Sequence, residues 1–434
     1  MKLFTLVAIG LLLPSLAYAQ STSPFGNRGE IDLNNTYHPP RVFIPKAEVT
    51  FDAKTQTVTG VFNAFNSEKS TVADLGYRVE LMSLPEGTEE AIQESSVILY
   101  DVQVFPENIT LAPQETKAVP VTYKLPGLPN GAYRMRLMMT SLRGRDLGWY
   151  DATITVTGSA VADVIELGPG PFDIPEYQDT VLEPLSGPNV SAGSSFEIQA
   201  EATSEQGITV TPVLDIYEFD QARGRLNQVI GRPQTLRAGQ PTRFKMPVVA
   251  ADQPEVYFGV LWLRGSSGRQ VSSLATYRWV VRGADADVLW TRIDRMGSKA
   301  NDKAIVAVDF VGAADAETTF DADVVVSLGD DHGVLASHTE QGLKLADSIR
   351  QGTFIFPLPR DIVGTPRVSV RIASPEKEYF AREVRYNLAP QQIDELASDA
   401  RVAEGRLKIG LVLIIVGAAA FGYSLWRSRK KRRS

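Results

Sequence analysis

The residue types that could carry out catalysis are few and poorly spaced in this chain of 434 residues. Of its three histidines, His332 and His338 are six positions apart, which fits neither the i, i+4 spacing of a helix nor the i, i+2 spacing of a strand. His38 lies beside Pro39 and Pro40 and has no evident partner. Cysteine is absent, which excludes thiolate chemistry and Cys-ligated metals. We therefore expect no catalytic residue, no metal and no cofactor.

Acidic residues occur in pairs, but their spacing is not that of a known site. The pairs are Asp285 with Asp287, Asp321 with Asp323, and Asp330 with Asp331. None matches the D-x-[DN]-x-[DN]-G…E loop that binds calcium, so solvated turns are the favoured interpretation and calcium binding the alternative. The nucleophile motif G-x-S-x-G is also missing, and Gly265 to Gly268 has the character of a hairpin turn. The chain is not expected to be an enzyme.

Two long hairpins contain the residues best suited to binding a partner. The candidates are Arg143, Arg145, Trp149 and Tyr150 on the first hairpin, and Arg264 and Arg269 on the second. Arginine and aromatic side chains on the loops of a rigid framework suit contacts with a protein or a cell-envelope polymer. The simpler interpretation, which we prefer, places Trp149, Trp262 and Trp279 in the core and treats the arginines as solubilising turn charges.

These hairpins belong to an internal repeat of three copies, at residues 111–158, 236–283 and 345–389. Apolar and polar residues alternate along the strands, as at Tyr133, Met135 and Leu137 with arginines between them. Such alternation is typical of antiparallel sheets with one buried and one solvated face. With no convincing amphipathic helix between the strands, the pattern predicts an all-β fold of three tandem Ig-like antiparallel β-sandwiches.

Three short segments of the first copy resemble those of a known class of module. They are the bend Phe65 to Lys69, the segment Leu111 to Lys117 and the segment Asn130 to Arg134. They are similar to the Ig-like modules of bacterial surface and periplasmic proteins, of the CARDB or fibronectin type III-like kind. The resemblance covers the first module best. It implies a sandwich fold outside the cytoplasm and a role as spacer, adhesion unit or binding platform.

Both ends of the chain have the character of membrane signals. Lys2, an apolar stretch and the A-x-A site at Ala17 to Ala19 predict a signal peptide. Residues 409–426 carry no charge and are followed by a tail rich in Lys and Arg, which predicts a single transmembrane helix with a cytoplasmic C-terminus. Within this span, Ala418 and Gly422 form a small-xxx-small pair that would let two helices pack as a homodimer, although such pairs also arise by chance.

The predicted organisation divides the chain into nine segments. They are a signal peptide (1–19), an N-terminal arm (20–40), module 1 (41–158), an acidic Pro/Gly linker (159–188), module 2 (189–283), module 3 (284–389), a stalk helix (390–408), the transmembrane helix (409–426) and a basic tail (427–434). The alternative for the linker is that residues 161–167 form an extra strand that pairs with a neighbouring module. The three modules are expected to form a stalk.

Net charge and location together limit the function. The chain carries a net charge of −7 and its dense basic cluster is the tail, so nucleic acid is not an expected partner. We expect a single-pass protein of the cell membrane, with its N-terminal part at the cell surface or in a periplasm. Its expected role is structural, adhesive or binding. The alternative is a non-catalytic subunit of a bacterial envelope complex for secretion, pilus-associated functions or transport.

Overall fold

A computed structural model describes residues 30–34, 40–84, 97–141, 146–178, 180–218, 225–312, 315–388 and 392–393. These residues form sheets that are antiparallel except for one parallel pair, Asn189–Val190 with Val280–Val281, together with one short 3-10 helix, which confirms the all-β prediction. No helix among them is long and apolar enough to cross a membrane. The predicted signal peptide, the span with Ala418 and Gly422, and the tail lie outside the described residues, as does the stalk helix apart from Gln392 and Ile393.

Module 1 is a sandwich of two sheets, in which strand alternation fills the core. On β7, Tyr133, Met135 and Leu137 are buried, whereas the arginines between them lie on the outer face. One sheet has the order β2-β3-β6, and the other has β4 between β5 and β7, with β8 at the edge. The strands are β2 (Val42–Asp52), β3 (Thr57–Asn66), β4 (Thr71–Ser83), β5 (Leu99–Leu111), β6 (Thr116–Lys124), β7 (Gly131–Ser141) and β8 (Asp146–Val156).

Module 2 pairs a three-stranded sheet, β15-β11-β9, with a larger sheet of order β10-β17-β16-β12-β13. Aromatic rings fill the space between them, and the rings of Phe196 and Trp279 meet edge to face at 5.6 Å. The elements are β9 (Glu166–Asp173), η3 (Pro175–Tyr177), β10 (Asn189–Val190), β11 (Ser195–Thr203), β12 (Ile208–Glu218), β13 (Arg225–Ile230), β14 (Gln234–Leu236), β15 (Thr242–Val249), β16 (Glu255–Arg264) and β17 (Ala275–Val281).

The acidic segment 159–188 is not an extended linker, which corrects the favoured prediction. Its residues 166–173 form β9, an edge strand of module 2 that pairs with β11. Pro169 is tolerated because an edge strand need not donate all its N–H groups. A Cβ at Gly170 would lie 2.9 Å from the carbonyl oxygen of Gln199, so only glycine allows this close approach. The proline and glycine residues of this segment are typical of a loop, but here they belong to an edge strand.

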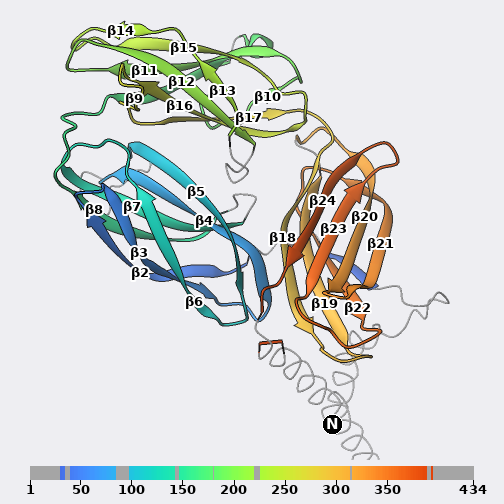
Figure 1. Ribbon diagram of the computed structural model, residues 1–434. Helices are drawn as coiled ribbons and strands as arrows, with labels where there is room; N and C mark the ends of the chain where they lie inside the picture. The colour runs from blue at the N-terminus through green and yellow to red at the C-terminus, as the bar shows by residue number, and fades with distance from the viewer. Residues whose placement is uncertain are drawn as a thin grey trace, which may run out of the picture.

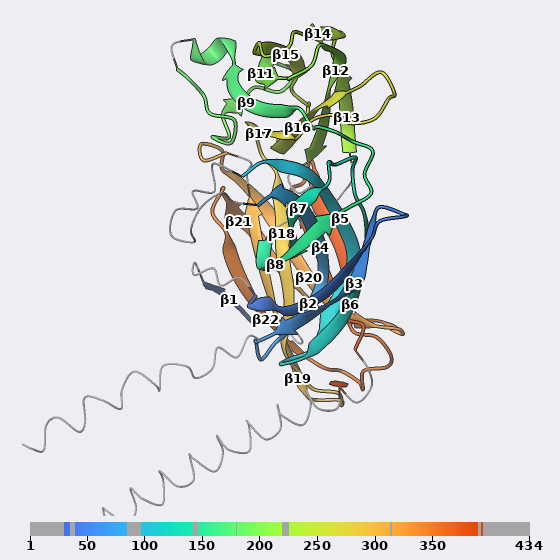
Figure 2. The same cartoon turned by 90° about the vertical axis from the view of Figure 1, so that its left-hand side faces the viewer.

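Module 3 is a third sandwich, which also recruits the predicted N-terminal arm. Its sheets are β21-β20-β23-β24 and β1-β22-β19-β18, and β1 pairs antiparallel with β22 from a position more than 300 residues earlier in the chain (Figure 2). The strands are β1 (Glu30–Asn34), β18 (Ala286–Met296), β19 (Lys303–Gly312), β20 (Phe320–Asp330), β21 (Gly333–Leu345), β22 (Arg350–Pro357), β23 (Arg367–Ala373) and β24 (Glu378–Arg385).

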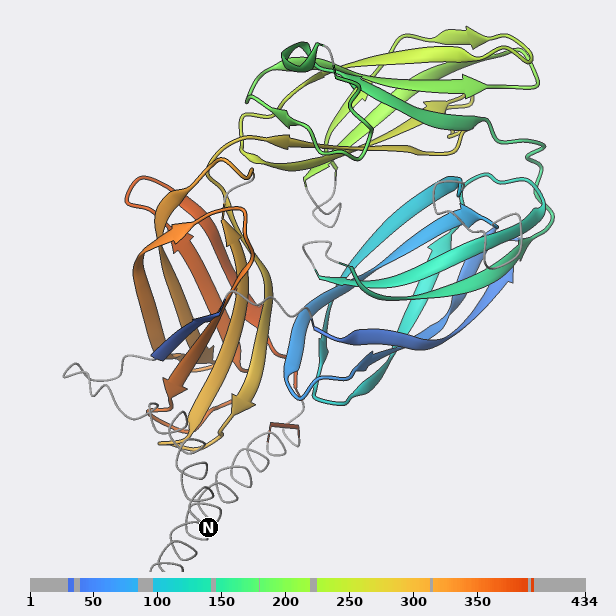
Figure 3. The same ribbon diagram turned by 180° about the vertical axis from the view of Figure 1, so that it is seen from behind.

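Modules 1 and 3 are joined side by side, so the modules do not form the expected stalk (Figures 1 and 3). The pairing of β4 with β7 begins at Leu75, which leaves Thr71 and Val72 beyond the end of β7. The strand β18 occupies this free edge, and the two modules thereby share an eight-stranded sheet. Trp290 of β18 packs into the core of module 1, and Ala73 of β4 packs into the core of module 3. We call this junction the β4–β18 seam.

Candidate functional site

The first predicted hairpin places one aromatic side chain in solvent. Trp149 on β8 is 57% exposed, which corrects the preferred prediction that it lies in the core. The guanidinium of Arg136 lies 5.4 Å from the centroid of the indole ring, in a cation–π contact. Tyr150 is half-buried and packs against the core of module 1. Arg143 and Arg145 lie outside the described residues.

Strand alternation contained the signal that would have placed Trp149 correctly. Ile154 and Val156 of β8 are buried, and counting back from them in steps of two reaches Tyr150. Trp149 falls on the opposite face of the strand, because successive side chains of a strand alternate. A large aromatic residue is commonly buried, but the position of Trp149 in the strand decides that its side chain faces outwards.

Charged side chains beside Trp149 form ion pairs along the outer face of β4, β7 and β8. Arg136 donates Nε and Nη2 to the two carboxylate oxygens of Asp151, at 2.8 and 3.1 Å. Arg78 pairs with Asp146 at 3.1 Å and with Glu80 at 2.9 Å. Such pairs near the surface contribute about 0–1 kcal/mol to stability. Their consequence is geometric, because the two hydrogen bonds to Asp151 hold the guanidinium of Arg136 beside the indole ring.

A second exposed aromatic residue borders a hollow that is also lined by Asp146 and Leu147, at the start of the strand that carries Trp149. Phe43 on β2 is 48% exposed. A Cβ at Gly148 would lie 3.0 Å from the Cα of Phe43, so glycine is what allows β8 to approach β2 this closely. The adjoining hollow has a volume of about 700 Å³ and is lined by Pro40, Arg41, Val42, Phe43, Glu68, Asp146, Leu147 and Arg292. We call Trp149, Arg136, Phe43 and this hollow the Trp149 surface.

The Trp149 surface lies at a junction between two modules. Arg292 belongs to β18 of module 3, whereas the other lining residues of the hollow belong to module 1 or to the residues just before it. The hollow contains both carboxylates and guanidinium groups, together with apolar side chains. Hollows of mixed polarity at domain boundaries are frequent binding sites.

The second hairpin is turned towards module 1 and does not join the Trp149 surface. Gln270, next to Arg269, donates its amide Nε2 to the carbonyl oxygen of Tyr100 in module 1, at 3.0 Å. Arg269 lines a separate hollow of about 890 Å³ between this hairpin and the end of module 1. Arg264, at the end of β16, is partly buried. The two predicted tips therefore lie in different places.

The other two tryptophans of the predicted hairpins are held inside module 2. Trp262 is partly buried and donates its indole N–H to Asp215 at 2.8 Å. Trp279 is fully buried in the core. For Trp279 the prediction of a core position is confirmed, and for Trp262 it holds in part.

The β4–β18 seam contains one partly buried and one buried ion pair that the sequence did not reveal. Asp74 of module 1 accepts a hydrogen bond from Arg382 of module 3 at 2.7 Å, and Arg292 pairs with Asp309 at 3.2 Å. Burial is the main cause that raises the pKa of Asp74, and it raises the pKa of Asp309 to about 6, with Arg292 opposing the shift. Breaking a buried pair leaves an uncompensated charge, so the Asp74–Arg382 contact, which joins the two modules, makes the junction specific.

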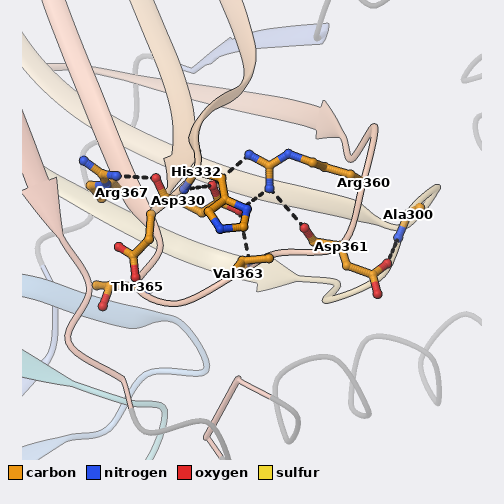
Figure 4. Close-up of polar contacts among 9 residues, drawn as sticks. Ala300, Asp330, His332, Arg360, Asp361, Val363, Thr365 and Arg367 are labelled. Atoms are coloured by element: carbon orange, nitrogen blue, oxygen red, sulfur yellow. Dashed lines mark hydrogen bonds and ion pairs between the residues drawn. The ribbon is translucent and has the colours of Figure 1, made fainter.

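The fully buried carboxylate of Asp330 organises one end of module 3 (Figure 4). Asp330 accepts two hydrogen bonds from Arg360, at 2.5 and 2.8 Å. It also accepts the backbone N–H groups of Val363 and His332, both at 2.9 Å. The hydrogen bonds from Arg360 are the first cause that lowers the pKa of Asp330 to about 2. This carboxylate fastens the β20–β21 turn to the segment that precedes β23.

The structure changes the interpretation of the acidic pairs. Asp330 is fully buried, and Asp285 and Asp287 are buried as well, so these three do not form solvated turns. Asp321 is exposed, as predicted, but it lies in strand β20 and not in a turn; Asp323 of the same strand accepts the backbone N–H of Gly342 at 2.9 Å. Within the part of the chain that the structure describes, no group of three His, Cys, Asp or Glu side chains is arranged to hold a metal ion.

Comparisons with known proteins identify no family. No family model and no curated protein matches the chain. Similar solved structures include Escherichia coli alpha-2-macroglobulin activated by porcine elastase, with 12% identity, a TM-score of 0.24 and coverage of 78% of this chain and 32% of that chain. A tetra-tandem repeat in the extending region of a large adhesion protein has 11% identity, a TM-score of 0.19 and coverage of 80% and 72%.

A third similar structure is the C-terminal domain of the Streptococcus pyogenes antigen I/II-family protein AspA. It has 9% identity, a TM-score of 0.20 and coverage of 51% of this chain and 99% of that domain. The present chain spans about a third of the macroglobulin chain named above. At TM-scores of 0.19 to 0.24 these similarities are weak, and they carry no argument about family or function.

Proposed function

We propose that this chain is a membrane-anchored, extracytoplasmic binding and structural protein of a bacterial envelope, without catalytic activity. The observation that carries the binding role is the Trp149 surface. Trp149 is exposed on β8 beneath the guanidinium of Arg136, and the same strand contributes Asp146 and Leu147 to a hollow between two modules, which the exposed Phe43 also lines. Tryptophan and arginine are the residues most enriched among those that dominate binding energy.

The anchoring part of the proposal rests on the sequence. The uncharged residues 409–426 and the basic tail support a single membrane span with a cytoplasmic C-terminus. The N-terminal apolar stretch and its A-x-A site support export. The β4–β18 seam gives such an anchored protein a fixed shape, so that it would present the Trp149 surface at a constant orientation.

Crosslinking tests the binding role. A photoactivatable amino acid replaces Thr153, an exposed residue of β8 close to Trp149, and the captured partner is identified by mass spectrometry. Capture that is lost on Trp149→Ala and retained on Val334→Ala, an exposed valine of β21, supports the proposal. Capture that is unchanged by Trp149→Ala refutes a binding role for this surface.

Topology is tested separately in the same cells. The chain has no cysteine, so Arg145→Cys introduces a single thiol for an impermeant reagent. Labelling of intact cells supports display at the cell surface, and labelling only after the outer envelope is opened supports a periplasmic location. Labelling that requires complete lysis refutes the proposed topology. Reproducible capture of a known secretion, pilus or transport component favours the alternative role as a complex subunit.

A further inference from the structure

One side of module 2 is left open by both of its sheets. The strand β13 ends the larger sheet and pairs only with β12 among the described strands, and β15 ends the smaller sheet and pairs only with β11. At the opposite side the sheets end in β9 and β10. An edge strand leaves N–H and C=O groups available to a further strand. Module 2 therefore has two edge strands bordering one opening.

A hollow of about 240 Å³ lies in this opening. It is lined by Ile216, Leu226, Asn227, Val249, Ala251, Tyr257 and Trp279. Leu226 is 52% exposed and Val249 is 67% exposed. Exposed apolar side chains around a hollow on open sheet edges promote association. The strand β15 carries Arg243 and Lys245 on its exposed face, and these charges lie N-terminal to Val249, which borders the hollow.

The backbone of β13 is shaped around this hollow. Asn227 pairs with Ile216 and Arg225 with Tyr217, so Leu226 is the extra residue of a β-bulge. At a bulge the regular alternation of side chains is interrupted, so one side chain points in a direction that a regular strand would not give it. Here the residue at the bulge lines the hollow.

A buried donor beside the hollow has no acceptor. Trp279 lines the hollow and is fully buried, and its indole Nε1 has no hydrogen-bond partner among the described residues. Buried indole N–H groups are usually paired, because an unsatisfied buried donor costs about 1–3 kcal/mol. A ligand that brings an acceptor into the hollow would satisfy this group.

We propose that the opening between β13 and β15 binds an extended peptide strand of a partner protein. An apolar side chain of the peptide fills the hollow, its backbone pairs with an open edge of module 2, and one of its carbonyl groups accepts the indole N–H of Trp279. A peptide fits better than a small apolar molecule because the site combines a hollow of mixed polarity with unpaired strand edges. This inference rests on the proposed binding role and adds a second surface with its own partner chemistry.

The test uses the purified full-length protein and a synthetic peptide of about eight residues, with alternating Val and Thr between terminal lysines. The control peptide has Pro at its centre, which removes a backbone donor. Binding is measured by titration, and its position by amide hydrogen exchange. We expect protection of β13 and β15 by the first peptide, with little effect of the second.

Two matched variants complete the test. Val249→Arg places a charge at the hollow and should weaken binding of the peptide by about tenfold or more. Val334→Arg makes the same change at an exposed valine of the edge strand β21 in module 3 and should leave binding unchanged. Both positions are exposed, so both variants should fold, which exchange in the module cores verifies.

Three results would overturn the inference: equal binding to the Val249→Arg protein, protection confined to β21 or β24, or no protection of β13 and β15 at millimolar peptide. Binding of a small apolar probe without protection of either strand would also overturn it, in favour of a small-molecule pocket. Because the assay uses purified protein, a failure of the predicted topology or of the Trp149 surface in cells would not affect it.

Discussion

Replacing Asp330 by Asn tests whether one carboxylate fastens the end of module 3. A fall in its pKa from 3.8 to about 2 corresponds to roughly 2.5 kcal/mol, since each pKa unit is worth about 1.4 kcal/mol. Its partner Arg360 is 37% exposed, so solvent screens part of this interaction. We therefore expect Asp330→Asn to destabilise module 3 by about 1.5–2 kcal/mol at pH 7.

The sign of the pH dependence follows from the lowered pKa. A carboxyl group whose pKa is lower in the folded state stabilises that state above its unfolded pKa of 3.8. This stabilisation is lost as the pH falls through about 2. The difference in stability between wild type and Asp330→Asn should thus be largest at neutral pH and should disappear below about pH 2.

Amide hydrogen exchange of the β20–β21 turn as a function of denaturant measures this local free energy of unfolding. Asp361→Asn is the matched control, because Asp361 lies in the same cluster but is half exposed and accepts one backbone N–H, from Ala300. The control should show a smaller loss. Equal losses in both variants, or a loss from Asp330→Asn that persists below pH 2, would refute the assignment of the stabilisation to the ionised Asp330.

Three further predictions concern the β4–β18 seam and the Trp149 surface. Arg382→Met leaves the carboxylate of Asp74 unpaired; because Arg382 is 29% and Asp74 17% exposed, solvent screens part of the pair, and the junction should weaken by about 1–2 kcal/mol, seen as faster amide exchange in β4 and β18 but not in module 2. The pKa of Asp309 is raised to about 6, so stability should increase as the pH falls through 6 towards 4, and Asp309→Asn should flatten this dependence in thermal unfolding. Trp149→Ala should change the free energy of unfolding by less than about 0.5 kcal/mol while abolishing partner capture, and a large loss of stability would contradict its assignment to the surface.

Strand alternation predicted the local structure of this chain well. In the segment Tyr133 to Leu137, the residues expected to face inwards are buried, and the arginines between them are on the outer face. This succeeds because the period of two is a property of the strand itself and needs no knowledge of its neighbours. The all-β class followed from the same local rule.

Contacts between distant segments could not be predicted in this way. The pairing of Thr71 and Val72 with β18 depends on where β7 ends, and one sequence does not specify which strand fills a free edge. Asp74 and Arg382, which are 308 positions apart, form their ion pair only because this pairing brings them together. The Trp149 surface was predicted in part, through the hairpin, but its hollow depends on Arg292 from module 3.

The β4–β18 seam also determines how the protein would respond to mechanical tension. A pull applied to module 1 and resisted at the C-terminal end of module 3 passes directly across the seam, because those two modules are hydrogen-bonded to each other. Module 2 lies outside this line of force while the seam holds. Rupture of the seam would transfer the load to module 2 and let the whole assembly lengthen before any sandwich unfolds. The few backbone pairs of the seam and the Asp74–Arg382 ion pair would then break first, and so protect the three sandwiches from unfolding.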